Sequence, residues 1–99
     1  MELFLYSSTP LEDARDVLED AIEEHLGHGA EITGGGSGIK GWNIDIDAVR
    51  DLEAPELKAF CDFLINQGVN SDAALNLYRE GAPNRRIYIG EYCERPRSD

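Results

Sequence analysis

Residues 11–26 form a helical pattern with two chemically opposite sides, and this pattern limits the possible folds more than any other segment does. At roughly 100° per residue, the apolar side chains fall on one arc and the acidic side chains on the other. A single helix of this length is marginal in water, so its apolar arc has to pack on another layer of structure. We expect that arc to contain Leu11, Ala14, Val17, Leu18, Ala21, Ile22, His25 and Leu26.

The opposite arc of this helix is acidic, with Arg15 as its single positive charge. Like charges four residues apart on a helix cost about 0.2–0.5 kcal/mol per pair, so the arc lowers the stability of the helix itself. A chain that keeps such a stripe uses it to attract a basic partner or to remain soluble. The acids of the arc are Glu12, Asp13, Asp16, Glu19, Asp20, Glu23 and Glu24.

Five other segments have the residue pattern of β-strands. Alternation of apolar and polar side chains is clearest in the first and third of them. Residues 71–75, which lead into the fourth strand, also fit the start of a short helix. In chain order, the predicted strands are 2–7, 30–33, 42–48, 74–79 and 86–92.

Both predicted helices have boundary signals in the sequence. Thr9 can cap the first helix, Pro10 suits its first position and Glu12 completes a capping box. Gly27 can end this helix in a left-handed conformation. The second predicted helix covers residues 55–67, with a proline at its start and a glycine directly after its end.

These elements follow the order β-α-β-β-α-β-β. The order predicts an α+β fold, a two-layer ferredoxin-like sandwich in which two helices lie on one face of a mainly antiparallel sheet. The other face of the sheet is then open. We expect residues 1–93 to form a single domain and residues 94–99 to form a flexible tail.

The acidic balance of the chain restricts its partners. With 20 acidic and 9 basic residues, the net charge is −11, which argues against nucleic acid and against anionic membrane surfaces. No apolar run has transmembrane length and the first residues lack the features of a signal peptide, so we expect a cytoplasmic protein. Two cysteines do not make a disulfide framework, and Cys61 has the spacing of a small core residue.

Strand parity places all four tyrosines on the open face of the sheet, beside carboxylates and amides. Tyrosine offers a large contact area with one polar group and is common at protein interfaces. An ordinary half-wet sheet is the alternative, because tyrosine also favours strands. The predicted partner-binding residues are Tyr6, Glu31, Asp45, Asp47, Tyr78, Tyr88 and Tyr92.

Three other patterns are possible sites of chemistry. The glycine-rich segment 34–41 lacks the Gly-Lys-Ser/Thr of a phosphate-binding loop, and a flexible hairpin connection is expected. Asp45 and Asp47 share one strand face, where solvated side chains are favoured over a cation site. His25 and His28 supply too few ligands for zinc. We therefore predict no catalytic residue, no metal site and no cofactor.

The segments 32–38 and 42–47, with the acidic helix before them, resemble small acidic bacterial α/β proteins, some of which are immunity proteins that neutralise a toxin. The resemblance implies an inhibitor that covers a basic active site with carboxylates and tyrosines.

The sequence thus favours a non-enzymatic, acidic protein-binding module. A homodimer that pairs through the open sheet face is the alternative, and a small divalent-metal-dependent enzyme that uses Glu31, Asp45 and Asp47 is a third. We expect the helix acids to steer a basic partner and the sheet to make the contact, on opposite sides of the domain. The predicted steering residues are Glu12, Asp16, Glu19, Asp20 and Glu23.

Overall fold

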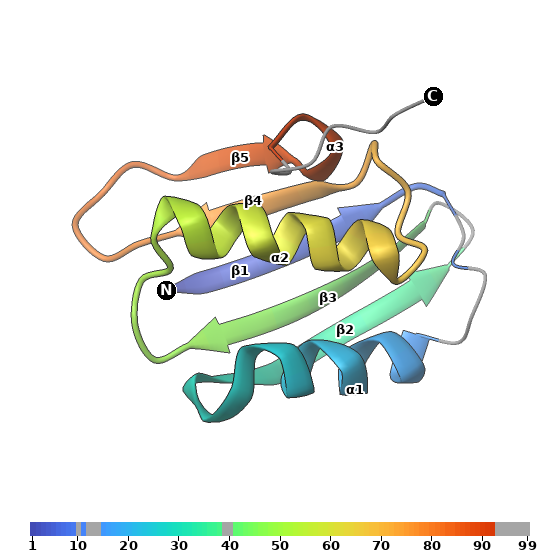
Figure 1. The fold of residues 1–99 in the computed structure, drawn as a ribbon, viewed down its shortest axis with the longest axis horizontal. Coiled ribbons are helices and arrows are strands. Elements are labelled where there is room, and N and C mark those ends of the chain that lie inside the picture. Colours follow the sequence, from blue (N-terminus) through green and yellow to red (C-terminus); the bar gives the residue numbers. More distant parts are fainter. Residues whose placement is uncertain (10, 12–14, 39–40, 93–99) are drawn as a thin grey trace.

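The computed structural model describes residues 1–9, 11, 15–38 and 41–92. The predicted α+β class and element order are confirmed: a five-stranded antiparallel sheet has the order β2-β3-β1-β4-β5, with α1 and α2 on one face (Figure 1). The strands are β1 (Glu2–Ser7), β2 (Ala30–Gly38), β3 (Gly41–Ala48), β4 (Ala74–Tyr78) and β5 (Arg85–Tyr88). The helices are α1 (Arg15–Leu26), the 3-10 turn η1 (Gly27–Gly29), α2 (Ala54–Asn66) and the short α3 (Ile89–Tyr92).

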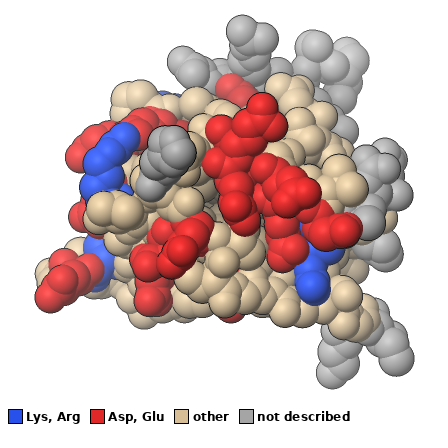
Figure 2. Space-filling model, turned by 90° about the horizontal axis from the view of Figure 1, so that it is seen from below, with Lys and Arg blue, Asp and Glu red and all other residues tan. Residues whose placement is uncertain are grey.

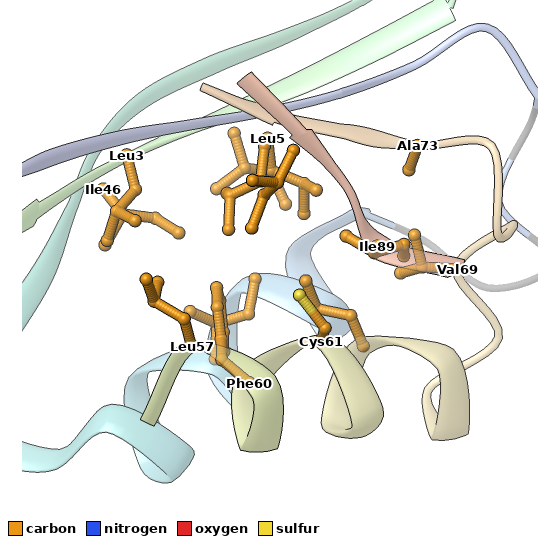
Figure 3. Close-up of a cluster of buried hydrophobic side chains, with 14 of the residues drawn as sticks. Leu3, Leu5, Ile46, Leu57, Phe60, Cys61, Val69, Ala73 and Ile89 are labelled. Carbon is orange, nitrogen blue, oxygen red and sulfur yellow. The ribbon is translucent and has the colours of Figure 1, made fainter. Parts of the chain in front are cut away.

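The core lies between the sheet and the helices. In Figure 3, the side chains of α2 face those of β1 and β3 across this layer. Leu3 and Leu5 of the central strand are fully buried, whereas Tyr6 is 45% exposed, so the predicted alternation of β1 is confirmed. Cys61 is fully buried, as its helical spacing predicts. The inward side chains of α2 are Leu57, Phe60, Cys61 and Leu64.

The ends of α2 follow local rules. Glu53 and Glu56 form a capping box, and Pro55 lies in the first turn, where its missing N–H costs no hydrogen bond. Gly68, just beyond the end, has a φ of 89°, which favours glycine. Gly27 likewise has a φ of 71° directly after α1, as predicted. The predicted start of α1 involves Pro10 and Glu12, which lie outside the described residues, as does the predicted tail 94–99.

The glycine-rich segment 34–38 is part of β2, and the predicted flexible connection is wrong for these residues. It pairs with β3 along its length, with a bulge between Ile32 and Gly34. A Cβ at Gly35 would lie 2.8 Å from the carbonyl oxygen of Asn43, and one at Gly34 would lie 3.2 Å from Asp45 Oδ2. Close packing, not loop flexibility, thus accounts for these glycines.

The last predicted strand ends early. β5 stops at Tyr88 and the chain then turns into α3, because Ile89 N donates to Ala73 O and Gly90 N donates to Ser71 O, each at 3.0 Å. A Cβ at Gly90 would lie 2.6 Å from Ser71 Cβ, so only glycine allows this approach. The fourth strand is confirmed, and the short helix that residues 71–75 also fitted does not form.

The apolar arc of α1 is narrower than predicted. Leu18 and Ile22 are its buried residues, whereas Val17 is 55% exposed. This helix lies by the edge strand β2 (Figure 1), and its position at the edge accounts for the small number of buried residues. Among the described residues, no helix is long and apolar enough to cross a membrane.

Candidate protein-binding surface

The sheet face opposite α1 and α2 carries most of the predicted contact residues, and we call it the open face. Tyr6, Tyr78 and Tyr88 project from it and are 45%, 37% and 44% exposed. The predicted place of Tyr92 is wrong: it belongs to α3 and its ring lies 6.0 Å from Lys58 Nζ of α2, on the helix side. By strand parity, the described residues of the open face are Glu2, Phe4, Tyr6, Glu31, Thr33, Asn43, Asp45, Asp47, Asn76, Tyr78, Arg86 and Tyr88.

Strand register sorts the open face into an acidic side and an aromatic centre. Glu31 lies opposite Asp47, which lies opposite Glu2, so three carboxylates cross β2, β3 and β1 in one row. Phe4 and Tyr78 then form an edge-to-face pair at 5.0 Å on β1 and β4. Like charges directly opposite each other weaken a sheet, so the acidic row is not explained by stability.

Asp45 has local partners on the open face. Asn43 Nδ2 donates a hydrogen bond to Asp45 Oδ1 at 3.0 Å, and Gly34 leaves room for the second carboxylate oxygen. Asp47, in contrast, is exposed beside Glu31. Among the described residues, no three His, Cys, Asp or Glu side chains form a group that could hold a metal ion. The two aspartates thus differ in role: one is held by its neighbours and the other faces solvent.

Acids from the helix and from the sheet meet in one hollow at the C-terminal end of α1. This acidic hollow has a volume of about 670 Å³. Because α1 lies against the sheet edge, its last turns reach the carboxylates of β2 and β3, which differs from the separation expected from the sequence. The residues that line the acidic hollow are Glu23, Glu24, Gly27, Ala30, Glu31, Asp47 and Val49.

The remaining steering residues extend this negative surface along α1. Figure 2 views the molecule from the side of α1 and β2 and shows acidic side chains gathered there. Asp16 and Asp20 are exposed, whereas Glu19 is 21% exposed and lies 3.8 Å from Arg15 Nε. Glu12 lies outside the described residues. The helix therefore presents a negative stripe that leads to the acidic hollow.

The basic residues near this surface are engaged elsewhere. Arg50 Nη1 donates to Glu56 Oε1 at 2.7 Å, and this hydrogen bond lowers the pKa of Glu56 to about 2. Arg86 Nε donates to Asn76 Oδ1 at 2.7 Å on the far strands of the open face. No ion pair involves an acid of the hollow within the described ranges. The negative charge of the acidic hollow is therefore available to a partner.

Several residues of this surface were missing from the predicted site. Residues two apart in a strand share a face, so Glu2 lies on the same face as Phe4 and Arg86 on the same face as Tyr88. The alternation of side chains in β1 and β5 could therefore have identified both residues. Val49, at the rim of the acidic hollow, is 84% exposed. Nothing in the sequence marks it, because a valine after a strand is ordinarily expected in the core.

His25 packs against aromatic rings of α2. Its imidazole stacks on Phe63 at 4.2 Å with an interplanar angle of 15°, and the loss of hydration lowers the pKa of His25 below 6.5. This contact accounts for a histidine on the apolar arc of α1.

The lowered pKa of His25 predicts a pH dependence of stability. Between its pKa in the folded state and 6.5, the unfolded chain binds more protons, so stability rises with pH through this window and is lost as pH falls through it. From pH 7.5 to pH 5.5, the free energy of unfolding measured with urea should therefore fall more in the wild type than in His25→Phe. Equal losses in the two proteins would contradict the prediction.

A search of protein-family models, of curated proteins and of solved structures found no significant match to this chain.

Proposed function

We propose that this protein is a non-enzymatic binding module that recognises a basic protein, in the manner of an immunity-type inhibitor. The observation that carries the proposal is the acidic hollow, in which four carboxylates from α1, β2 and β3 line a space of about 670 Å³. A concave site lined by carboxylates suits the side chain of a lysine or arginine.

The rest of the surface supports two separate tasks in such a complex. The exposed acids of α1 and the net charge of −11 attract a basic partner over distance and speed encounter. Tyr6, Tyr78 and Tyr88 of the open face provide contact area that slows dissociation. The same tyrosines also support the alternative function, a homodimer that pairs through the open face.

The fold that we propose for this module is ferredoxin-like. Its support is the strand order β2-β3-β1-β4 with antiparallel neighbours and with α1 and α2 on one face. In this layout β5 and α3 are additions at the edge next to β4, away from the acidic hollow. β5 adds Tyr88 to the open face, and no described residue of β5 or α3 lines the acidic hollow.

Charge reversal at the acidic hollow tests the proposed function. We expect Glu23→Lys with Glu31→Lys to weaken binding of a basic partner at least about tenfold, because each lysine would repel the cation that the hollow accepts. The matched control is Glu80→Lys with Glu91→Lys, which changes the net charge equally at exposed positions beyond β4. The measurement is titration at low salt of a basic protein that immobilised wild type retains from the native host.

The two double variants separate a site from a general charge effect. If both weaken binding equally, the hollow is not the binding site. If the wild type retains no basic protein at low salt, the proposed function is wrong.

A further inference from the structure

We propose that the partner presents an extended, basic segment that adds to the sheet as a sixth strand, next to β2. This inference rests on the proposed function and defines the form of the partner that the acidic surface recognises. Addition of a strand to a sheet edge is a general mode of peptide recognition, in which main-chain hydrogen bonds give affinity and alternate side chains give specificity.

The backbone of β2 offers the necessary groups. Met1 and Ala48 exchange hydrogen bonds at 2.8 and 3.0 Å, so the even-numbered residues of β3 direct their backbone toward β1 and the odd-numbered residues toward β2. Gly34 and Gly36 are the partners of Asp45 and Asn43, and their backbone faces β3. Gly35 and Ser37 alternate with these two residues along β2, so their N–H and C=O groups point away from the sheet.

The residues of β2 itself do not protect this edge. β2 is the outermost strand on its side of the sheet, and Gly35 and Ser37 lie along its outer edge. Sheet edges are usually protected by lysine, proline or a covering segment, and residues 30–38 contain neither lysine nor proline. The opposite edge differs, because β5 has only 4 residues and continues into α3.

Charge selects a basic segment as the occupant of this edge. On the α1 side of β2 lie the exposed acids of the helix, together with Arg15, whose Nε is 3.7 Å from the position of a Cβ at Gly35 and 3.8 Å from Glu19. The acidic row of the open face lies on the other side. Side chains of an added strand alternate between these two sides, so lysine or arginine at successive positions would meet carboxylates on both. The acidic hollow, lined by Ala30 and Glu31 at the start of β2, accepts one of them. A second copy of this chain would instead bring acid against acid.

Amide exchange of the isotope-labelled protein tests this pairing directly. The probe is an acetylated nine-residue peptide of alternating lysine and arginine, added at low salt. We expect the peptide to slow hydrogen exchange at the amides of Gly35 and Ser37 at least about tenfold, because an added strand gives each outward N–H an acceptor. The amides of Gly34 and Gly36, which already face β3, serve as internal controls and should change little.

A matched pair of substitutions tests the same contact through affinity. Ser37→Pro removes one outward N–H, whereas Ser37→Thr keeps it, so we expect at least about tenfold weaker peptide binding for the first variant and less than about twofold for the second. A peptide N-methylated at the alternate residues that face β2 repeats the test without changing the protein. It replaces the proline variant if that variant does not fold.

The outcomes distinguish this inference from the proposed function. If basic proteins bind but Gly35 and Ser37 gain no protection, or if the N-methylated peptide binds as well as the parent, the added strand is wrong while the proposed function stands. If neither peptide nor basic protein binds, the proposed function fails as well. Protection that grows with protein concentration alone would identify a second copy as the occupant and overturn the inference.

Discussion

Replacement of Phe60 by alanine should lower the free energy of unfolding by about 3–5 kcal/mol, the range for loss of a buried aromatic ring. Phe60 is fully buried at the centre of α2, where its side chain faces the sheet (Figure 3). Its ring also lies 5.9 Å from His25 and 6.2 Å from Phe63, so its loss removes support from α1 as well. Urea unfolding followed by circular dichroism measures the effect.

The control for this variant is Val49→Ala, at a position that is 84% exposed. Removal of an exposed side chain should change the unfolding free energy by no more than about 0.5 kcal/mol. A small domain has about 5–15 kcal/mol of stability in total, so Phe60→Ala should leave it close to unfolding. Similar values for the two variants would show that Phe60 does not lie in the core.

Gly41→Ala should be comparably destabilising for a different reason. Gly41 has a φ of 137°, and a Cβ there would lie 2.2 Å from Ser7 O and 2.9 Å from Ser8 Cα. The strained φ costs about 1–3 kcal/mol. The clash with the backbone at the end of β1 adds about another 1–3 kcal/mol, as in an overpacked core.

Gly81→Ala isolates the backbone part of this effect. Gly81 also has a positive φ, 76°, but a Cβ at this position would have no described heavy atom within 4 Å beyond its chain neighbours. Gly81→Ala should therefore lower the free energy of unfolding only by the cost of the strained φ, about 1–3 kcal/mol. Gly41→Ala should lower it by more. Urea unfolding followed by tryptophan fluorescence measures both effects. It reports directly on this site, because Trp42, the single tryptophan, follows Gly41 and its Nε1 donates to Thr9 O at 2.9 Å. Equal losses would show that the backbone after β1 can move away from Gly41.

The elements that the sequence predicted well are those whose pattern arises from their own burial. β1 and β3 are inner strands, so one side of each is buried and the other is open, and their side chains alternate accordingly. α2 has a capping box, a proline and a glycine at its boundaries. For these elements, local chemistry and tertiary position agree, and the pattern alone determines the assignment.

The elements that the sequence predicted poorly depend on contacts between distant segments. The glycines of β2 have a strand conformation because β3 pairs beside them, and the propensity of glycine indicates a loop. Tyr92 lies outside the sheet because Gly90 approaches Ser71. The acidic hollow also escaped prediction, since parity identifies Glu31 and Asp47 but only the position of α1 at the sheet edge brings Glu24 to them.

The central place of β1 has a consequence for how the chain folds during synthesis. β1 is the first strand of this chain, yet Leu5 pairs with Ile44 on one side and with Leu75 on the other. The β2–β3 hairpin is local and can form within microseconds once both strands exist, whereas the second edge of β1 has to wait for β4. Leu3 and Leu5 pack against α2, so we expect them to stay accessible to chaperones until residues 54–66 have left the ribosome.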